Sequence, residues 1–89
     1  ITGVRLGGVQ LAFNLEDKPG TMRPIFDVLR EHHASIISIL SSNDAEVEGT
    51  RHVFMRIRPM EHQAEDALIS VLKERFNLLY WVRNTVHMS

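Results

Sequence analysis

The residues from Val9 to Leu15 alternate strictly between two faces. Val9, Leu11, Phe13 and Leu15 fall on one face, and Gln10, Ala12 and Asn14 fall on the other. An alternation with a period of two over this length predicts a half-buried β-strand. The segment Glu16–Gly20 follows directly, and its Pro-Gly pair predicts a tight turn. The first strand therefore buries one face and ends at a sharp bend.

A helical pattern follows this turn. Thr21 is the candidate N-cap, and Pro24 fits the first turn, where a helix needs no donor from the backbone nitrogen. With Thr21 as the cap, Pro24 is the third helical residue. The side chains that recur at three- and four-residue spacing are Met22, Ile25, Phe26, Leu29 and His33. This spacing predicts an amphipathic helix that ends near a partly buried His33.

Four more elements are predicted downstream. Ser35–Ser42, rich in isoleucine and serine, predicts a strand, and Asn43–Thr50 predicts a polar hairpin loop. Arg51–Arg58 alternates, with Val53, Met55 and Ile57 on one face and His52, Phe54, Arg56 and Arg58 on the other. Glu61–Phe76 predicts a second helix with an apolar stripe at Ala64, Ala67, Leu68, Val71, Leu72 and Phe76. Leu78–Val82 predicts the last strand.

The predicted order is strand, helix, strand, strand, helix, strand. Right-handed crossovers fold this order into an α+β, ferredoxin-like βαββαβ arrangement: a four-stranded antiparallel sheet with both helices on one face. The expected strand order is 4-1-3-2, so the second and fourth strands are the edges. A chain of 89 residues allows one domain. We place it at residues 9–83, between a linker at 1–8 from an upstream domain and a tail at 84–89.

The segment Leu15–Met22 resembles the opening of an ACT domain, in which an apolar strand runs into Asp-x-Pro-Gly and then a helix. The turn His33–Ile36 precedes the second strand, as in that family, and the resemblance extends over residues 9–82 in the same element order. More narrowly, the glycine-rich lead-in and the residues Arg51–Arg56 resemble the ACT domain that follows a CBS-domain pair in acetoin-utilisation-type proteins.

The resemblance implies regulatory binding rather than catalysis. ACT domains bind small molecules, often amino acids, and commonly pair through a sheet edge, with the ligand between the loop after the first strand and the second strand of the neighbour. The implied ligand-binding residues are Asp17, Lys18, Pro19, Gly20, Thr21, Met22, Ser35, Ile36 and Ile37. The implied partners are a second copy, an amino acid or similar ligand, and an attached upstream domain such as a CBS pair.

Three positions depart from the family pattern. Many amino-acid-binding members have Gly-x-Asn-Ile before the second strand, where this chain has His33, Ala34, Ser35 and Ile36. The glycine that permits a left-handed helix end is thus replaced by His33. Many members also lack a proline at the position of Pro24. These differences bear on the identity of the ligand more than on the fold.

The turn 17–22 has a chemistry of its own. A helix N-terminus offers unpaired N–H donors and the positive end of the helix dipole. The amides of Gly20, Thr21, Met22 and Arg23 suit a carboxylate, while Asp17 suits an ammonium group. A plain capped turn, with Asp17 bonded to the local backbone, is the alternative interpretation.

The predicted edge strand Ser35–Ser42 contains no charge and no proline. An exposed edge of this kind is a template for pairing with another strand, and soluble monomers usually blunt such edges. Two copies joined there would form one eight-stranded sheet, so the sequence predicts a homodimer. A ligand-free dimerisation or scaffold module that uses the same edge is the alternative function.

Composition argues against several other classes. The absence of cysteine excludes a disulfide framework, a thiolate metal site and a cysteine nucleophile, and it fits a reducing cytoplasm. Ten basic against 11 acidic side chains provide no global attraction to nucleic acid. No apolar run is long enough to span a membrane.

No catalytic or metal-binding constellation stands out either. The five histidines lie on separate elements or helix faces, and no serine is flanked by nucleophile-elbow glycines. We therefore expect no metal, no cofactor and no enzymatic activity of this domain. The open face of the sheet is expected to show Gln10, Ala12, Asn14, Phe54, Arg56 and Arg58. We expect Phe54 and the arginine stems to pack against another domain or helix of a longer chain.

Overall fold

The computed structural model describes residues 8–42 and 48–84. The element order is β1 (Gly8–Glu16), α1 (Arg23–Glu31), β2 (Ile36–Ser42), β3 (Thr50–Ile57), α2 (His62–Arg75) and β4 (Leu78–Asn84). Residues 43–47 of the predicted hairpin loop lie outside the described residues, as do residues 1–7 of the expected linker and 85–89 of the expected tail. Each predicted strand and helix is present, and its ends lie within two residues of the predicted ones. The largest differences are at the end of β4, which continues to Asn84, and at the end of α1, which stops at Glu31.

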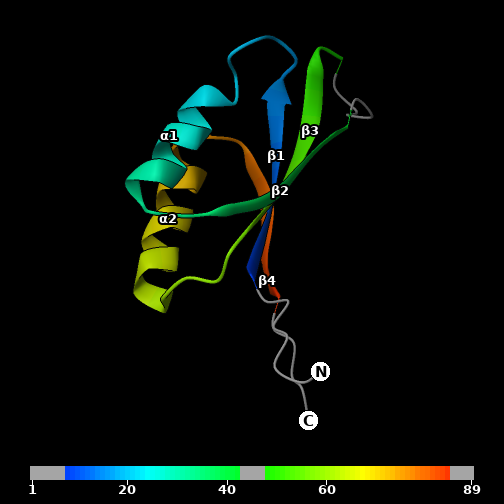
Figure 1. Cartoon of the computed structure of the whole chain (residues 1–89). Helices are drawn as coiled ribbons and strands as arrows, with labels where there is room; N and C mark the ends of the chain where they lie inside the picture. The colour runs from blue at the N-terminus through cyan, green and yellow to red at the C-terminus, as the bar shows by residue number, and fades with distance from the viewer. Residues whose placement is uncertain (1–7, 43–47, 85–89) are drawn as a thin grey trace.

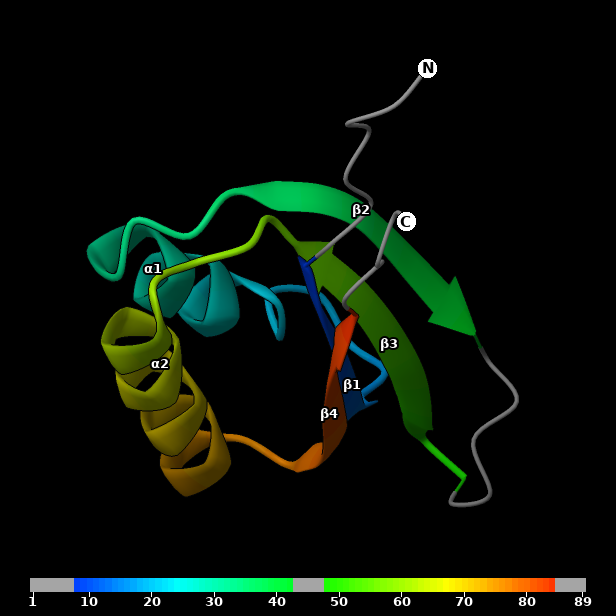
Figure 2. The same cartoon turned by 90° about the horizontal axis from the view of Figure 1, so that it is seen from below.

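The strands form one antiparallel sheet in the order β2-β3-β1-β4, which is the expected order read from the other edge. Both helices cover the same face of this sheet (Figures 1 and 2). The predicted ferredoxin-like fold is therefore confirmed. β1 and β3 are central, and β2 and β4 are the two edges. The turn after β1 and the end of the β2–β3 connection lie at the same end of the sheet, because Glu16 pairs with Thr50.

The core lies between the sheet and the helices. The odd-numbered residues of β1 and β3 face it, as their alternation predicts, and the helices contribute aliphatic side chains. Phe13 is fully buried and makes an edge-to-face contact with Phe76, with ring centroids 6.4 Å apart. The core residues are Val9, Leu11, Phe13, Leu15, Ile25, Val28, Leu29, Val53, Met55, Ile57, Leu68, Ile69 and Leu72.

The start of α1 differs from the prediction. Its N-cap is Met22, with helical backbone angles and no side-chain capping bond. Thr21 is therefore not the cap: its hydroxyl donates a hydrogen bond backward to the Lys18 carbonyl oxygen at 3.1 Å. Pro24 is the second residue of the helix rather than the third, which still leaves it where no helical donor is needed.

The end of α1 explains how the chain manages without a glycine. His33 adopts φ +57°, the left-handed conformation that helix-ending glycines usually take. Its N–H donates to the Arg30 carbonyl at 3.1 Å, and the Ala34 N–H donates to the Leu29 carbonyl at 2.9 Å. This is the bond pattern of a Schellman motif. His33 is exposed, so the expectation of a partly buried side chain was wrong; its neighbour His32 is half-buried instead.

We expect His33→Gly to stabilise the domain by about 0.5–1 kcal/mol, because glycine removes the steric cost of positive φ. His32→Gly is the matched control. His32 has φ −94°, so glycine relieves no strain there and adds only unfolded-state entropy and lost contacts. Urea unfolding followed by circular dichroism measures both. A His33→Gly variant no more stable than the parent would contradict this account of the helix end.

The buried face of α2 is rotated relative to the predicted stripe. Leu68 and Leu72 are buried as expected, but Ala64 and Ala67 are exposed, while Ile69 and Glu65 are buried. The reason is an ion pair with β4. Arg83 Nε donates to Glu65 Oε1 at 2.7 Å, and Arg83 Nη2 donates to the same oxygen. A carboxylate can be buried when a guanidinium satisfies it, and a pattern of apolar residues alone does not reveal this.

The sheet face opposite the helices carries the even-numbered residues of β1 and β3. Gln10 is exposed, and Asn14, Phe54 and Arg56 are half-buried, broadly as expected. Ala12 is the exception, with no exposed surface. Its cross-strand neighbours are Phe54 on β3 and Tyr80 on β4, and two large side chains cover the small one between them.

Candidate functional site

The turn between β1 and α1 is held to the rest of the sheet by one backbone bond. The Asp17 N–H donates to the Gly49 carbonyl at 2.9 Å, which ties the turn to the residues before β3. Gly20 has φ +85°, and a Cβ built there would find no atom within 4 Å. The backbone at Gly20 thus faces open space, and a ligand can approach its peptide group closely.

The same turn presents backbone donors. Among the described residues, the amides of Gly20, Thr21 and Met22 donate to no backbone carbonyl. The Arg23 N–H donates to the Gly20 carbonyl at 3.3 Å, so the expectation that it too would bind a ligand was wrong. Pro24 has no N–H to offer. Three consecutive amides at the N-terminal end of α1 therefore remain for an anion, with the helix dipole behind them.

The side chains of the turn divide into paired and unpaired charges. Lys18 Nζ lies 2.8 Å from Glu16 Oε2, with both side chains about two-thirds exposed. A hydrogen bond from Lys18, reinforced by its charge, lowers the pKa of Glu16, and the same bond raises the pKa of Lys18. The exposed Asp17 carboxylate makes no hydrogen bond or ion pair within the described part of the chain. Among the described residues, Asp17 is thus the acidic side chain of this turn that remains unpaired.

Arg51 is a neighbour of the turn that the sequence reading missed. It is half-buried at the start of β3, and its Nη2 donates to Thr21 Oγ1 at 3.4 Å. Its Nε is buried and has no hydrogen-bond partner in the part of the chain that the structure describes. A sequence signal existed: Arg51 falls on the same alternating face as Val53 and Met55, where a charge is unexpected. It adds a cation beside the three amides.

Ser35, Ile36 and Ile37 do not lie near the turn of the same copy. Ile36 pairs with Ile57, which in turn pairs with Val9 at the start of β1, whereas the turn follows the end of β1. The two sets of predicted ligand-binding residues are therefore at opposite ends of one sheet. The structure brings together the residues 17–22 alone.

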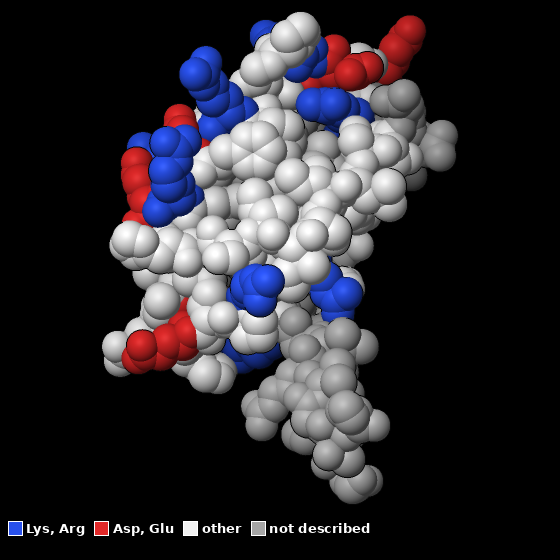
Figure 3. Space-filling view, in the orientation of Figure 1, with Lys and Arg blue, Asp and Glu red and all other residues white. Residues whose placement is uncertain are grey.

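β2 is exposed from Ile36 to Ser41, and its last residue, Ser42, is half-buried. Leu40 is 67% exposed, and Ile36, Ile37 and Ile39 are each more than one-third exposed. β2 crosses the front of Figure 1, and in the same orientation the middle of the surface in Figure 3 carries no charged side chain. The Lys, Arg, Asp and Glu side chains are gathered around this uncharged area. An exposed, uncharged edge strand of this kind is a template for pairing, as the sequence predicts.

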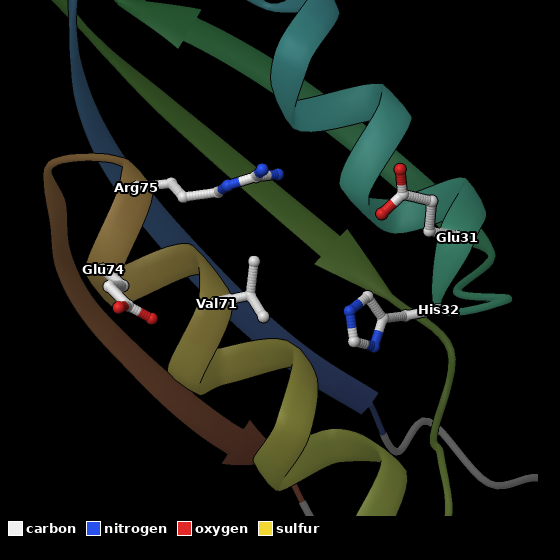
Figure 4. A pocket seen from close by; sticks show the side chains of 5 residues that line it. All are labelled: Glu31, His32, Val71, Glu74 and Arg75. Atoms are coloured by element: carbon white, nitrogen blue, oxygen red, sulfur yellow. The ribbon is translucent and has the colours of Figure 1, made fainter.

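A cleft of about 400 Å³ lies between the ends of the two helices. It is lined by Glu31, His32, Val71, Glu74 and Arg75. In Figure 4, His32, which follows α1 directly, and Val71 of α2 face each other across the cleft, and Arg75 extends toward α1. Two carboxylates and one guanidinium give it no single sign of charge. No group of three His, Asp or Glu side chains in residues 8–42 and 48–84 is placed to hold a metal ion.

No protein-family model and no curated protein matches this sequence. Solved structures do match. The ACT domain of a GTP pyrophosphokinase from Chlorobium tepidum superposes with a TM-score of 0.57 at 18% identity, over 88% of this chain and 95% of that domain. The regulatory subunit of aspartate kinase from Thermus thermophilus, in its ligand-free form, gives 0.61 at 18% identity, over 91% of this chain and 53% of that one.

A formyltetrahydrofolate deformylase from Pseudomonas syringae also matches, with a TM-score of 0.61 at 18% identity, over 94% of this chain and 28% of the deformylase. The chain thus spans about a quarter of the deformylase and about half of the kinase subunit. Within the described ranges, neither helix has the length and apolar character that crossing a membrane requires. At these identities the likeness concerns architecture, and the chain has the ferredoxin-like fold of an ACT domain.

Proposed function

We propose that this chain is a regulatory domain that binds a small zwitterion, an amino acid, where two copies pair through β2. The observation that carries the proposal is the turn 17–22, where three free amides, the Arg51 guanidinium and the exposed Asp17 carboxylate lie together. The amides and Arg51 would bind the ligand's carboxylate, and Asp17 would bind its ammonium group.

Pairing through β2 would complete this site. An antiparallel pair of β2 strands centred on Ile39 sets Ile36 of one copy beside Ser42 of the other. Ser42 lies at the end of the sheet that carries the turn, because it pairs with His52 and His52 pairs with Asn14. Residues 35–37 of one copy would then approach the turn 17–22 of the other. The predicted ligand-binding residues 17–22 and 35–37, which are far apart within one copy, would meet at the dimer interface.

A ligand bound at this dimer interface could regulate the attached domain. A ligand that contacts both copies favours the arrangement of the pair in which its contacts are best, and this shifts the population of the two-domain assembly. The shift would reach whatever domain is attached, such as a CBS pair. The similarity to a regulatory subunit of aspartate kinase supports this kind of role.

Asp17→Asn tests the ligand part of the proposal. The variant keeps the shape of the side chain and the backbone bond to Gly49 but loses the charge. A bond to a charged group contributes about 1.5–3 kcal/mol, so we expect the affinity for the bound amino acid to fall about ten- to a hundredfold. The amino acid is identified by screening the twenty common ones by thermal shift, and its affinity is measured by calorimetry.

Asp27→Asn is the matched control, because Asp27 lies on the exposed side of α1, away from the turn, and pairs with Arg30 at 2.9 Å. It should bind the ligand as the parent does. If no amino acid binds while the protein still dimerises, the ligand-free scaffold is the correct function. If binding survives Asp17→Asn unchanged, the ligand is not held by this turn.

A further inference from the structure

A second cavity lies on the sheet face opposite the helices, away from the turn 17–22. Its volume is about 230 Å³. The side chains and backbone that line it belong to Gln10, Leu11, Ser38, Leu40, Phe54, Met55, Arg56 and Tyr80. All four strands contribute, so the cavity depends on the sheet as a whole.

Phe54, Leu40 and Tyr80 form the apolar side of the cavity. Ala12 of β1 pairs with Phe54 on one side and Tyr80 on the other, and Leu40 pairs with Phe54 further out. Phe54 and Tyr80 cover Ala12, which has no exposed surface, and both rings also line the cavity. Tyr80 remains 49% exposed.

Polar groups lie in the adjacent row of the same face. Arg56 pairs with Gln10 on one side and with Ser38 on the other, so a guanidinium, an amide and a hydroxyl stand side by side across three strands. Successive residues on one face of a strand are about 7 Å apart. An aromatic row and a polar row that contains one cation, Arg56, thus run parallel at a separation that a short molecule can bridge.

We propose that this cavity binds a small aromatic carboxylate, with its ring against Phe54 and Tyr80 and its carboxylate toward Arg56. A cavity of about 150 Å³ holds benzene, so 230 Å³ accommodates a ring and a short acidic chain. Ring-on-ring contact and a guanidinium–carboxylate bond provide affinity and orientation. The site is separate from the amino-acid site at the turn and needs neither Asp17 nor a second copy.

The probe for this site is 3-phenylpropionate, which has a ring and a carboxylate but no ammonium group for Asp17. Titration into isotopically labelled protein, followed by amide chemical shifts, locates the binding. We expect saturable shifts at Gln10, Ala12, Phe54 and Tyr80, and none at residues 17–22. The neutral analogue 3-phenyl-1-propanol should bind more weakly. An absence of saturable shifts, or shifts confined to the turn, would overturn the proposal.

Two variants separate the ring contact from the charge. Tyr80→Ser should weaken 3-phenylpropionate about tenfold, whereas Leu79→Ser should not, because Leu79 is equally exposed at 47% but does not line the cavity. Arg56→Met should abolish the preference for the carboxylate over the alcohol. Equal binding by the Tyr80 and Leu79 variants, or a preference that survives Arg56→Met, would show that the cavity is not the site.

Discussion

Replacing Arg83 by alanine should cost about 3 kcal/mol of the free energy of unfolding. The Glu65 carboxylate is 2% exposed, and Arg83 donates to it through two nitrogens. Removing one partner of a buried pair typically costs about 3–5 kcal/mol, because an unpaired charge stays behind. The lower end applies because the Arg83 side chain is 36% exposed and water can reach the site. A domain of this size has only about 4–13 kcal/mol in total.

Two further variants distinguish the pair from a generic loss of charge. Arg30→Ala removes the exposed partner of Asp27 and should cost less than about 1 kcal/mol. The double variant Glu65→Leu, Arg83→Met replaces the pair by apolar groups and should recover most of the loss. Urea unfolding of the four proteins measures this. If Arg83→Ala is no less stable than Arg30→Ala, the pair does not determine how α2 packs on β4.

Ile39→Lys should dissociate the proposed β2 dimer. Ile39 is the midpoint of β2 and 44% exposed, so the lone copy tolerates a lysine there. In an antiparallel pair centred on this residue, two lysines would lie opposite each other, and like charges in that position are destabilising. Two isoleucines also lose their burial, at about 1.5–3 kcal/mol each. We therefore expect the dissociation constant to rise at least about a hundredfold.

Leu79→Lys is the control for this experiment, because it places the same charge on the other edge strand at a similar exposure of 47%. Analytical ultracentrifugation over a range of concentrations should show a dimer for Leu79→Lys and a monomer for Ile39→Lys. The reverse result would place the joint at β4. A monomeric parent at high concentration would remove the dimer from the proposal.

Much of the fold could be predicted because the alternation in β1 and β3 reports burial directly. The face of α2 that is buried could not be predicted in this way, because the sequence pattern treats Ala64 and Ala67 as core residues and Glu65 as a surface residue. What decides their positions is the Arg83 side chain, which belongs to a strand 18 residues further on. Long-range pairing of this kind leaves no periodic signature.

The candidate site shows the same division. The turn 17–22 could be located from its Pro-Gly pair and from its resemblance to the opening of an ACT domain. Which of its backbone N–H groups are free to donate depends on the exact backbone conformation. The helix begins one residue later than Thr21 predicts, and this uses the Arg23 amide for an internal bond. Arg51 reaches the turn only because Glu16 and Thr50 pair across two strands. Pairing partners are set by the assembled sheet, so the cation was not foreseen.

In the part of the chain that the structure describes, the sheet has two open edges, which gives the domain two potential pairing surfaces. Among these residues β4, like β2, has no neighbouring strand beyond it, and Leu79, Tyr80, Trp81 and Val82 are exposed along it. Pairing through β2 alone closes at two copies, whereas pairing through both edges has no natural end and would polymerise the domain into a ribbon. A segment or partner that covers β4 would restrict such an assembly to two copies.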